Sequence, residues 1–220
     1  GADVIDTCGT GGTGLRTFNI STATALVAAG AGVHVAKHGN RTATRASGSA
    51  DVLAELGVNL DAPPAAVARC LQQARVCFCF AVRCHPAMKY AVPVRKALGV
   101  RTIFNLLGPL TNPAGARRQV MGVFDAALTE TIASVLAMLG TVRAFVVHAE
   151  DGMDEFSTTA PTRVCELLDG RIAARTIAPE DFHLPRARLD DLLVSSPGES
   201  AAVIRSVLAG TAGPARAIVL

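Results

Sequence analysis

Three separated segments of this 220-residue chain carry residue types suited to holding a phosphorylated molecule. The first is a glycine-rich loop that reads Cys8-Gly9-Thr10-Gly11-Gly12-Thr13-Gly14. A helix is expected to begin shortly after it, because Asn19 and Ser21 are both favourable N-cap residues. Glycines let the backbone approach a ligand closely, and a helix start presents N–H groups that favour an anion. A Walker loop and a dinucleotide fingerprint are disfavoured, because no Lys-Ser/Thr follows the glycines and Lys37, not an acidic residue, ends the next strand.

The second and third segments carry charge of opposite sign. The second reads Lys37-His38-Gly39-Asn40-Arg41, and its two cations suit phosphate oxygens. The third ends in Asp154-Glu155, whose hard oxygen donors suit Mg²⁺. A solvated basic turn and a surface acidic loop are the alternatives for these two segments. His38 and His85 are either ligand contacts or buried histidines with satisfied hydrogen bonds.

The elements that must position these residues follow from hydrophobic patterning. Short β-branched runs alternate with Ala/Leu-rich stretches, which predicts an α/β fold with a mixed, mainly parallel sheet flanked by helices. We expect strands at 3–7, 32–36, 76–82, 119–124, 143–148, 163–168, 171–177 and 215–220. We expect helices at 21–30, 49–56, 64–74, 87–98, 128–139 and 198–209, and an ordered connection at 101–116. Ligands bind outside the carboxyl ends of such strands, so the polar strand ends predict one shared pocket.

Composition excludes several classes of protein. Half of the residues are apolar and 18% are charged, which excludes a disordered chain. No apolar run reaches the ~18 residues of a membrane span, and we expect no signal peptide and no membrane partner. A net charge of +3 without tryptophan argues against a nucleic-acid interface. The six cysteines fit reduced thiols in a cytoplasmic protein, and Cys77, Cys79 and Cys84 lack the spacing of a zinc site. The abrupt ends suggest a partial chain.

Four ordered motifs resemble those of the anthranilate phosphoribosyltransferases. They read GTGGTGLRTFNIST, KHGNRTATRASGSADVLAELGVNL, HPAMKYAVPVRKALGVRTIFNLLGPLTNPAGA and DGMDEFS. The resemblance implies one catalytic α/β domain over 1–220, with remnants of a small helical domain at about 84–116. It implies Mg²⁺, a homodimer at full length, and transfer of a phosphoribosyl group from 5-phosphoribosyl 1-diphosphate to anthranilate, the second step of tryptophan biosynthesis from anthranilate.

The resemblance also implies site residues, position by position. Those for phosphoribosyl diphosphate are Gly9, Gly12, Thr13, Thr17, Asn19, Ser21, Thr22, Lys37, His38, Gly39, Asn40, Arg41, Thr42, Ala43, Thr44, Arg45 and Ser49. Those for anthranilate are Gly9, Asn40, His85 and Arg95, and those for the metal are Ser21, Asp154 and Glu155. No residue is expected to act as a nucleophile. Thr13, Arg45 and Ala149 depart from the residues usual in the family, which are Asp, Ser and Gly.

Two other functions are alternatives. A pyrimidine nucleoside phosphorylase of the same superfamily would use inorganic phosphate and a nucleoside. A catalytically inactive paralogue would bind single-stranded nucleic acid, and it should show a basic stripe and lost metal ligands. The retained Asp154 and Glu155 and the mild net charge disfavour this second alternative.

Overall fold

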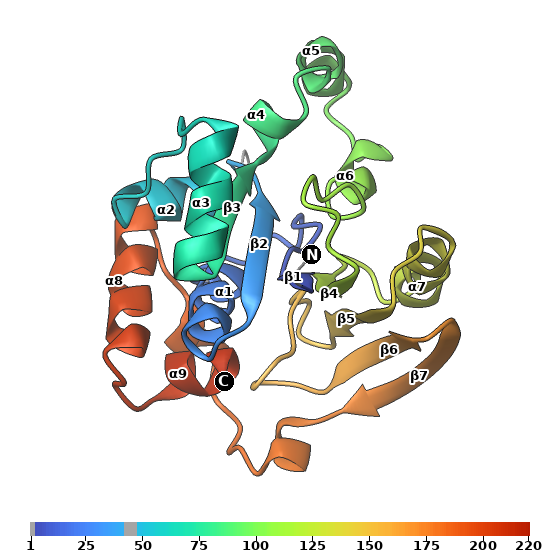
Figure 1. Cartoon of the computed structure of the whole chain (residues 1–220). Helices are drawn as coiled ribbons and strands as arrows, with labels where there is room; N and C mark the ends of the chain where they lie inside the picture. The colour runs from blue at the N-terminus through green and yellow to red at the C-terminus, as the bar shows by residue number, and fades with distance from the viewer. Residues whose placement is uncertain (1–2, 42–47) are drawn as a thin grey trace.

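A mixed seven-stranded sheet forms the centre of the molecule in a computed structural model that describes residues 3–41 and 48–220 (Figure 1). The strand order is β3-β2-β1-β4-β5-β6-β7. The first five strands along the chain pair in parallel, and β6 and β7 are antiparallel. The strands are β1 (Val4–Asp6), β2 (His34–Gly39), β3 (Val76–Phe80), β4 (Arg118–Gly122), β5 (Arg143–Ala149), β6 (Thr162–Leu168) and β7 (Arg171–Ile177). The predicted mainly parallel sheet and the hairpin at its end are confirmed.

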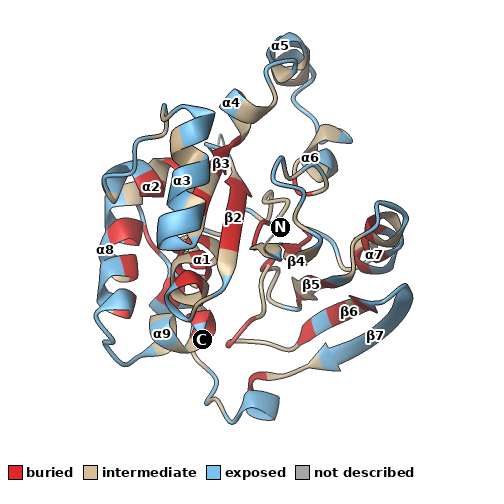
Figure 2. Cartoon of the chain, viewed as in Figure 1, coloured by how far each residue is buried: buried red, intermediate tan, exposed pale blue. Residues whose placement is uncertain are grey.

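Helices cover both faces of the sheet. On one face lie α1 (Ile20–Gly30), α2 (Ser49–Glu55), α8 (Pro197–Leu208) and α9 (Pro214–Val219), which share the largest apolar cluster. On the other face lie α3 (Pro64–Ala74), which packs on β2 and β3, and α7 (Leu128–Met138), which packs on β5 and β6. The buried residues concentrate on the strands and on the helix sides that face them (Figure 2).

The segment after β3 leaves the sheet and returns to it. It carries α4 (Ala81–Cys84), α5 (Met88–Leu98) and α6 (Phe104–Leu107), and α5 lies farthest from the sheet in Figure 1. Most of α5 is exposed, including Tyr90 at 74%. The connection at 101–116 is ordered as expected, because Asn112 donates hydrogen bonds back to the sheet. This segment is the one expected to belong to a small helical domain.

The predicted strand at 215–220 is wrong, because these residues form α9 instead. Pro214 stands at the first helical turn, where its missing N–H costs nothing. Ile218 and Val219 are buried in the cluster formed with α1 and α8. A short apolar run cannot distinguish a strand from a buried helix by periodicity alone.

Two strand boundaries also differ from the prediction. β3 ends at Phe80, and the next residues form the short α4 rather than extending the strand to 82. β2 runs from His34 to Gly39, not from 32 to 36, because Lys37, His38 and Gly39 pair in register with Phe78–Phe80 of β3. Lys37 and His38 therefore lie within the sheet, each 2% exposed, and not in the loop after it.

β7 forms one edge of the sheet. Its residues are exposed except for the half-buried Ile177. Arg171 and Arg175 project from this strand, and Arg175 pairs with Glu166 of β6 at 3.2 Å. The strand at the other edge, β3, has α3 packed on one of its faces.

Candidate functional site

The glycine loop after β1 packs directly against the acidic turn after β5. The N–H of Gly11 donates to Asp154 Oδ2 at 2.9 Å, and the N–H of Thr10 donates to the carbonyl of Gly122 at 2.8 Å. A Cβ at Gly9 would lie 2.6 Å from Asp154 Oδ2, so any side chain at this position would have to displace the Asp154 carboxylate. Gly11, Gly12 and Gly14 have φ values of +64°, +79° and +77°, a region that glycine adopts without strain. Two of the three predicted segments thus meet.

Asn19 joins several of the predicted site residues. It is the N-cap of α1, and its Oδ1 accepts the N–H of Thr22 at 3.1 Å. The same oxygen accepts the hydroxyls of Ser21 and Ser49, each at 3.3 Å. Thr22 is itself buried at the start of the helix. The starts of α1 and α2 are therefore fixed beside one another at the site.

Lys37 lies beneath the glycine loop as a buried cation. Its Nζ donates to the carbonyl of Thr7 at 3.1 Å and to Ser21 Oγ at 2.9 Å. Burial lowers the pKa of Lys37, and the negative charges of Asp6, Glu155 and Asp154 oppose that change. This geometry gives the site a fixed positive charge next to Ser21 and the acidic turn.

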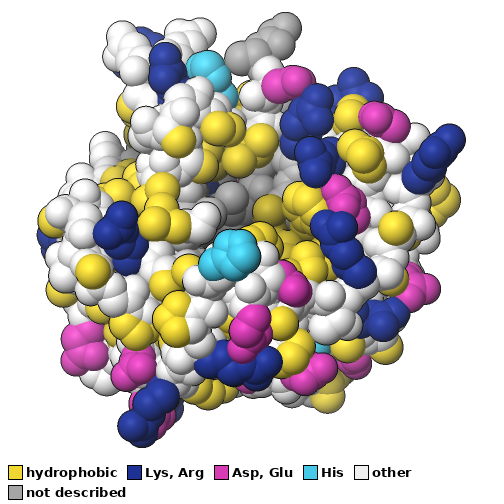
Figure 3. All heavy atoms as spheres, turned by 90° about the horizontal axis from the view of Figure 1, so that it is seen from below, with side chains coloured by type: hydrophobic (Ala, Val, Ile, Leu, Met, Phe, Trp, Pro, Cys, Tyr) yellow, Lys and Arg dark blue, Asp and Glu magenta, His cyan; other side chains and the backbone are white. Residues whose placement is uncertain are grey.

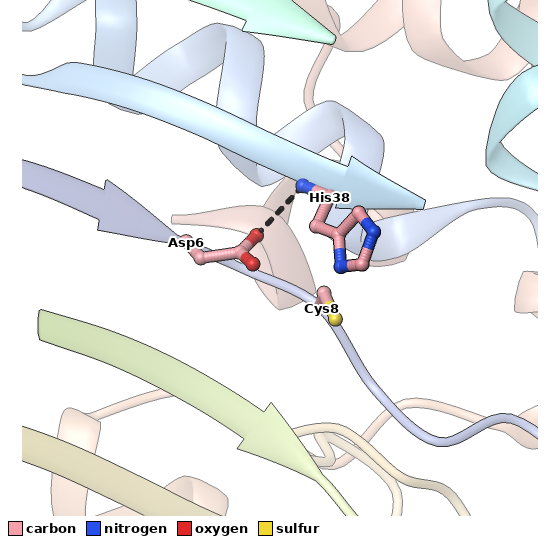
Figure 4. A group of neighbouring side chains, drawn as sticks. All are labelled: Asp6, Cys8 and His38. Atoms are coloured by element: carbon pink, nitrogen blue, oxygen red, sulfur yellow. Dashed lines mark hydrogen bonds between the residues drawn. The ribbon is translucent and has the colours of Figure 1, made fainter. Parts of the chain in front are cut away.

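Asp6 compensates that charge from the end of β1, and the sequence reasoning did not single it out. Its Oδ1 accepts the N–H groups of Thr7 at 2.7 Å and His38 at 3.1 Å (Figure 4). Its Oδ2 accepts Asn112 Nδ2 at 2.7 Å. Burial raises the pKa of the Asp6 carboxyl, and Lys37 and these donors oppose the rise. The one feature of the sequence that could have pointed to Asp6 is its place shortly before the glycine loop.

Asp6, Cys8 and His38 bring a carboxylate, a thiol and an imidazole within 4.8 Å of one another (Figure 4). These atoms are already committed to hydrogen bonds or protonated. His38 Nδ1 lies 3.0 Å from the carbonyl of Gly108, and its Nε2 lies 3.1 Å from His85 Nε2. Burial also raises the pKa of the Cys8 thiol well above its ordinary value. We therefore interpret the cluster as a structural contact between β1 and β2 and not as a metal site.

The two histidines link three segments of the chain. His38 donates from Nδ1 to Gly108, since a carbonyl can only accept, so its Nε2 accepts from His85. Burial and the neighbouring His85 lower the pKa of His38 to about 4. His38 is therefore neutral at pH 7 and connects β2 with α4 and the connection at 101–116.

The acidic turn has a fixed shape. Asp151 accepts the hydroxyls of Ser157 at 2.6 Å and of Thr159, and it accepts the N–H of Met153 at 3.0 Å. Ser157 Oγ in turn accepts the N–H of Thr159 at 2.9 Å. This network fixes the backbone that presents Asp154, which is 4% exposed.

Asp154, Glu155 and Ser21 are the residues suited to a metal ion. They offer two carboxylates and a hydroxyl, all hard oxygen donors of the kind that Mg²⁺ prefers. Ser21 and Glu155 line the same cavity, and Asp154 accepts a hydrogen bond from Gly11 of the adjoining glycine loop. The donor set therefore fits Mg²⁺.

The other predicted residues lie farther from this centre. Arg41 is exposed and pairs with Asp51 at 2.7 Å, so it is a surface cation in this structure. Asn40 is exposed, and its Oδ1 accepts the N–H of Arg41 at 2.8 Å. Arg95 lies on α5, with its guanidinium 5.5 Å from the ring centre of Phe104. The positions of Thr42, Ala43, Thr44 and Arg45 lie outside the described residues.

Of the remaining loop residues, Thr13 and Thr17 make local contacts. Thr13 Oγ1 accepts the N–H of Leu15 at 3.3 Å. Thr17 forms an isolated bridge with Leu193. Both contacts help to fix the chain between the glycine loop and α1.

Arg101 is a residue of the site that the sequence reasoning missed. Its Nη2 donates to the carbonyl of Gly12 at 2.8 Å, and its guanidinium lies 4.3 Å from the ring centre of Phe124. Arg101 falls within the third of the quoted motifs, but nothing in that motif points to its contact with Gly12, which lies 89 positions away in the sequence.

A cavity of about 510 Å³ opens beside the site, on the face that carries α1 and α9. Ser21 and Glu155 belong to its wall, but most of its lining is apolar, from Val120, Phe156, Ile177, Pro179, Leu184 and Ile218. Seen from below, hydrophobic side chains gather around a hollow in the surface (Figure 3). Such a lining suits a phosphorylated sugar poorly, so the polar strand ends are the better candidate for one.

Comparison with known proteins identifies the family. The chain matches the family described as "Glycosyl transferase family, a/b domain" over residues 1–220. It is 56% identical over 216 residues to an anthranilate phosphoribosyltransferase of Moorella thermoacetica, covering 98% of this chain and 64% of that protein. It is 58% identical over 217 residues to one of Thioalkalivibrio sulfidiphilus, again covering 64% of that protein. The chain thus spans slightly less than two thirds of these relatives.

Solved structures show the same fold. The anthranilate phosphoribosyltransferase of Thermus thermophilus superimposes with a TM-score of 0.93 at 47% identity, covering 99% of this chain and 64% of that one. The enzyme of Saccharomyces cerevisiae in complex with PRPP and Mg gives 0.89 at 30% identity, covering 98% and 61%. Within the described residues, no helix has the length and apolar character needed to cross a bilayer. The chain belongs to the glycosyl transferase family whose a/b domain it matches along its whole length.

Proposed function

We propose that this chain is the α/β part of an anthranilate phosphoribosyltransferase, which transfers the phosphoribosyl group of 5-phosphoribosyl 1-diphosphate to anthranilate. The observation that carries the proposal is the contact between Gly11 and Asp154. It joins the glycine loop, suited to phosphate, to the carboxylates suited to Mg²⁺. Lys37 and Ser21 lie at the same junction. Relatives with 54–58% identity carry this activity in their names.

The reaction displaces diphosphate from C1 of the ribose. The amine nitrogen of anthranilate forms the new bond to C1, the C1–O bond breaks, and diphosphate leaves with the electron pair while the amine loses a proton. An aromatic amine is neutral at pH 7, so no strong base and no nucleophilic side chain are needed. The principal role of the protein is to orient the two substrates and to balance the charge that develops on the leaving group.

Several residues would offset the negative charge that develops on the leaving diphosphate. The glycine loop leads to the N-terminus of α1, an end of a helix that favours an anion, and Lys37 adds a buried positive charge beside Ser21. Asp154, Glu155 and Ser21 would hold Mg²⁺. When bound, the ion would neutralise diphosphate oxygens. The structure of the yeast enzyme with PRPP and Mg supports this assignment.

The second substrate is a small aromatic acid, and its carboxylate calls for a bidentate donor. Arg95 is the arginine that the family resemblance places there, with Asn40 and His85 as neighbours. The yeast enzyme has been solved in complex with 4-fluoroanthranilate, which supports an aromatic acid as a ligand. Arg95 lies on α5, so we infer that this substrate binds between that helix and the strand ends.

The test is a coupled assay on the full-length protein that carries this chain, following anthranilate consumption by its fluorescence. Wild type should consume anthranilate only with phosphoribosyl diphosphate and Mg²⁺ present. Arg95→Ala should raise the KM for anthranilate at least about tenfold and leave that for the sugar diphosphate within about twofold. Phosphorolysis of a pyrimidine nucleoside, with no anthranilate consumption, would instead establish the phosphorylase alternative and overturn the proposal.

Location and assembly are part of the same proposal. All six cysteines are free thiols, and four of them are buried, which supports a reducing compartment such as the cytoplasm. We infer a homodimer for the full-length protein, with the exposed apolar side chains of α5 in its support. Mass measurement in solution would test this assembly.

A further inference from the structure

Arg101 is held in place on two sides by the segments that form the site. Its Nη2 donates to the carbonyl of Gly12 at 2.8 Å, and its Nε lies 3.9 Å from the position that a Cβ of Gly12 would take. Its guanidinium stacks over the ring of Phe124 with the centre 4.3 Å away. A guanidinium restrained in this way loses little further freedom when it binds a ligand.

The Phe124 ring, the platform on which the guanidinium lies, belongs to a residue that is itself hydrogen-bonded to the glycine loop. The N–H of Phe124 donates to Thr10 Oγ1 at 3.1 Å, and the N–H of Thr10 donates to Gly122 at 2.8 Å. The ring, the loop and the arginine therefore form one unit at the carboxyl ends of β1 and β4. A displacement of the loop would carry Arg101 with it.

Among the residues that the structure describes, no acid compensates the charge of Arg101. Two other cations at strand ends, Lys37 and Arg41, are already engaged: Lys37 lies buried on Thr7 and Ser21, and Arg41 pairs with Asp51. Arg101 has no ion pair within residues 3–41 and 48–220, and it is exposed. Of its five N–H donors, one is used by a described residue, through the carbonyl of Gly12.

We propose that Arg101 binds the diphosphate group of the sugar substrate with its remaining N–H donors, while Gly12 and Phe124 hold its guanidinium in position. The inference rests on the proposed function, since it assigns a further residue to the same site. A planar donor beside a glycine loop, paired with no acid among the residues that the structure describes, matches the oxygens of a diphosphate. Its attachment to Gly12 also couples the connection at 101–116 to the loop that the substrate would contact.

The experiment compares three variants of the full-length protein with a matched control. Arg101→Gln removes the charge, Arg101→Lys keeps the charge without the planar fork, and Phe124→Leu removes the platform. The control is Arg117→Gln, because Arg117 is also exposed and also donates to a glycine carbonyl, that of Gly140 at 3.0 Å, at the opposite end of β4. Binding of inorganic diphosphate in the presence of Mg²⁺ is measured by calorimetry, and KM is measured for each substrate.

Arg101→Gln should weaken diphosphate binding and raise the KM for the sugar diphosphate about tenfold or more, with the KM for anthranilate within about twofold. Arg101→Lys and Phe124→Leu should give smaller changes in the same direction, and Arg117→Gln none. Equal diphosphate affinity in Arg101→Gln and Arg117→Gln would overturn the proposal, as would a parallel rise in both KM values. If wild type fails to consume anthranilate, the proposed function fails, while the diphosphate measurement still tests Arg101 as an anion-binding residue.

Discussion

Asn112 connects the buried carboxylate of Asp6 to the neighbouring strand. Its Nδ2 donates to Asp6 Oδ2 at 2.7 Å and to the carbonyl of Ala36 at 2.8 Å, so one amide spans β1 and β2. The same residue returns the connection at 101–116 to the sheet. Two properties of the site depend on this relationship: the compensation of Lys37 by Asp6 and the position of the segment that carries Arg101.

Asn112→Ala should therefore destabilise the fold. It leaves Asp6 Oδ2 and the Ala36 carbonyl without a donor in a buried setting, and we expect a loss of roughly 2–3 kcal/mol in the free energy of unfolding. Urea denaturation measures this loss. Asn59→Ala is the control, because Asn59 is exposed and its side chain accepts the N–H of Asp61. A loss no greater than that of the control would show that Asn112 does not support Asp6.

Gly122 should tolerate no side chain. A Cβ there would lie 1.7 Å from the backbone oxygen of Asp154, so Gly122→Ala must displace the acidic turn. We expect destabilisation of about 2 kcal/mol or more and a large loss of activity. Gly30→Ala, at the end of α1 with no described atom within 4 Å of its Cβ, is the matched control. Thermal unfolding of both variants, with activity at a permissive temperature, separates the two effects.

His38 should make the protein less stable in mild acid. Its pKa is about 4 in the fold and about 6.5 when unfolded, so between these values the unfolded chain binds more protons. The free energy of unfolding should therefore rise with pH from about 4 to 6.5, by up to about 3 kcal/mol from this residue alone. His38→Gln should flatten that rise, and His183→Asn, at an exposed histidine, should not. An unchanged slope in His38→Gln would contradict the assignment.

Ser157→Ala should weaken the metal site without touching its ligands. The hydroxyl of Ser157 donates to Asp151 and accepts the N–H of Thr159, so its loss loosens the turn that presents Asp154 and Glu155. We expect the Mg²⁺ concentration for half-maximal activity to rise several-fold, with a loss of about 1–2 kcal/mol in stability. Ser134→Ala on the surface of α7 is the control. A change in stability alone, at unchanged Mg²⁺ dependence, would show that the turn is shaped by other contacts.

Much of the fold is predictable from the sequence because periodicity and strand-end chemistry are local. The predicted helix at 64–74 matches Pro64–Ala74 to the residue, and Asn19 is one of the two caps expected for α1. The failures are non-local. Lys37 and His38 look like loop residues, because nothing in their own segment shows that β3 pairs with them. Residues 215–220 look like a strand until α1 and α8 are seen to bury them as a helix.

Part of the site is also predictable, because the residue types within a single segment are a local signal. The glycine loop and the acidic turn can be inferred from residue types, and the structure brings them into contact. Asp6, Asn112 and Arg101 cannot, because each acts through a partner distant in the sequence: Asp6 and Asn112 stand 106 positions apart. An ordinary asparagine or arginine in an irregular segment carries no local mark of such a contact.

The exposed edge strand β7 has a consequence for how the molecule behaves among copies of itself. A free edge displays unpaired backbone groups that could recruit the edge of a neighbouring molecule. Arg171 and the Glu166-paired Arg175 place charged side chains along this strand, and charged side chains on an edge oppose pairing with another edge. The sheet is thereby discouraged from extending into a fibre from this side, and neutral residues at those two positions would remove the safeguard.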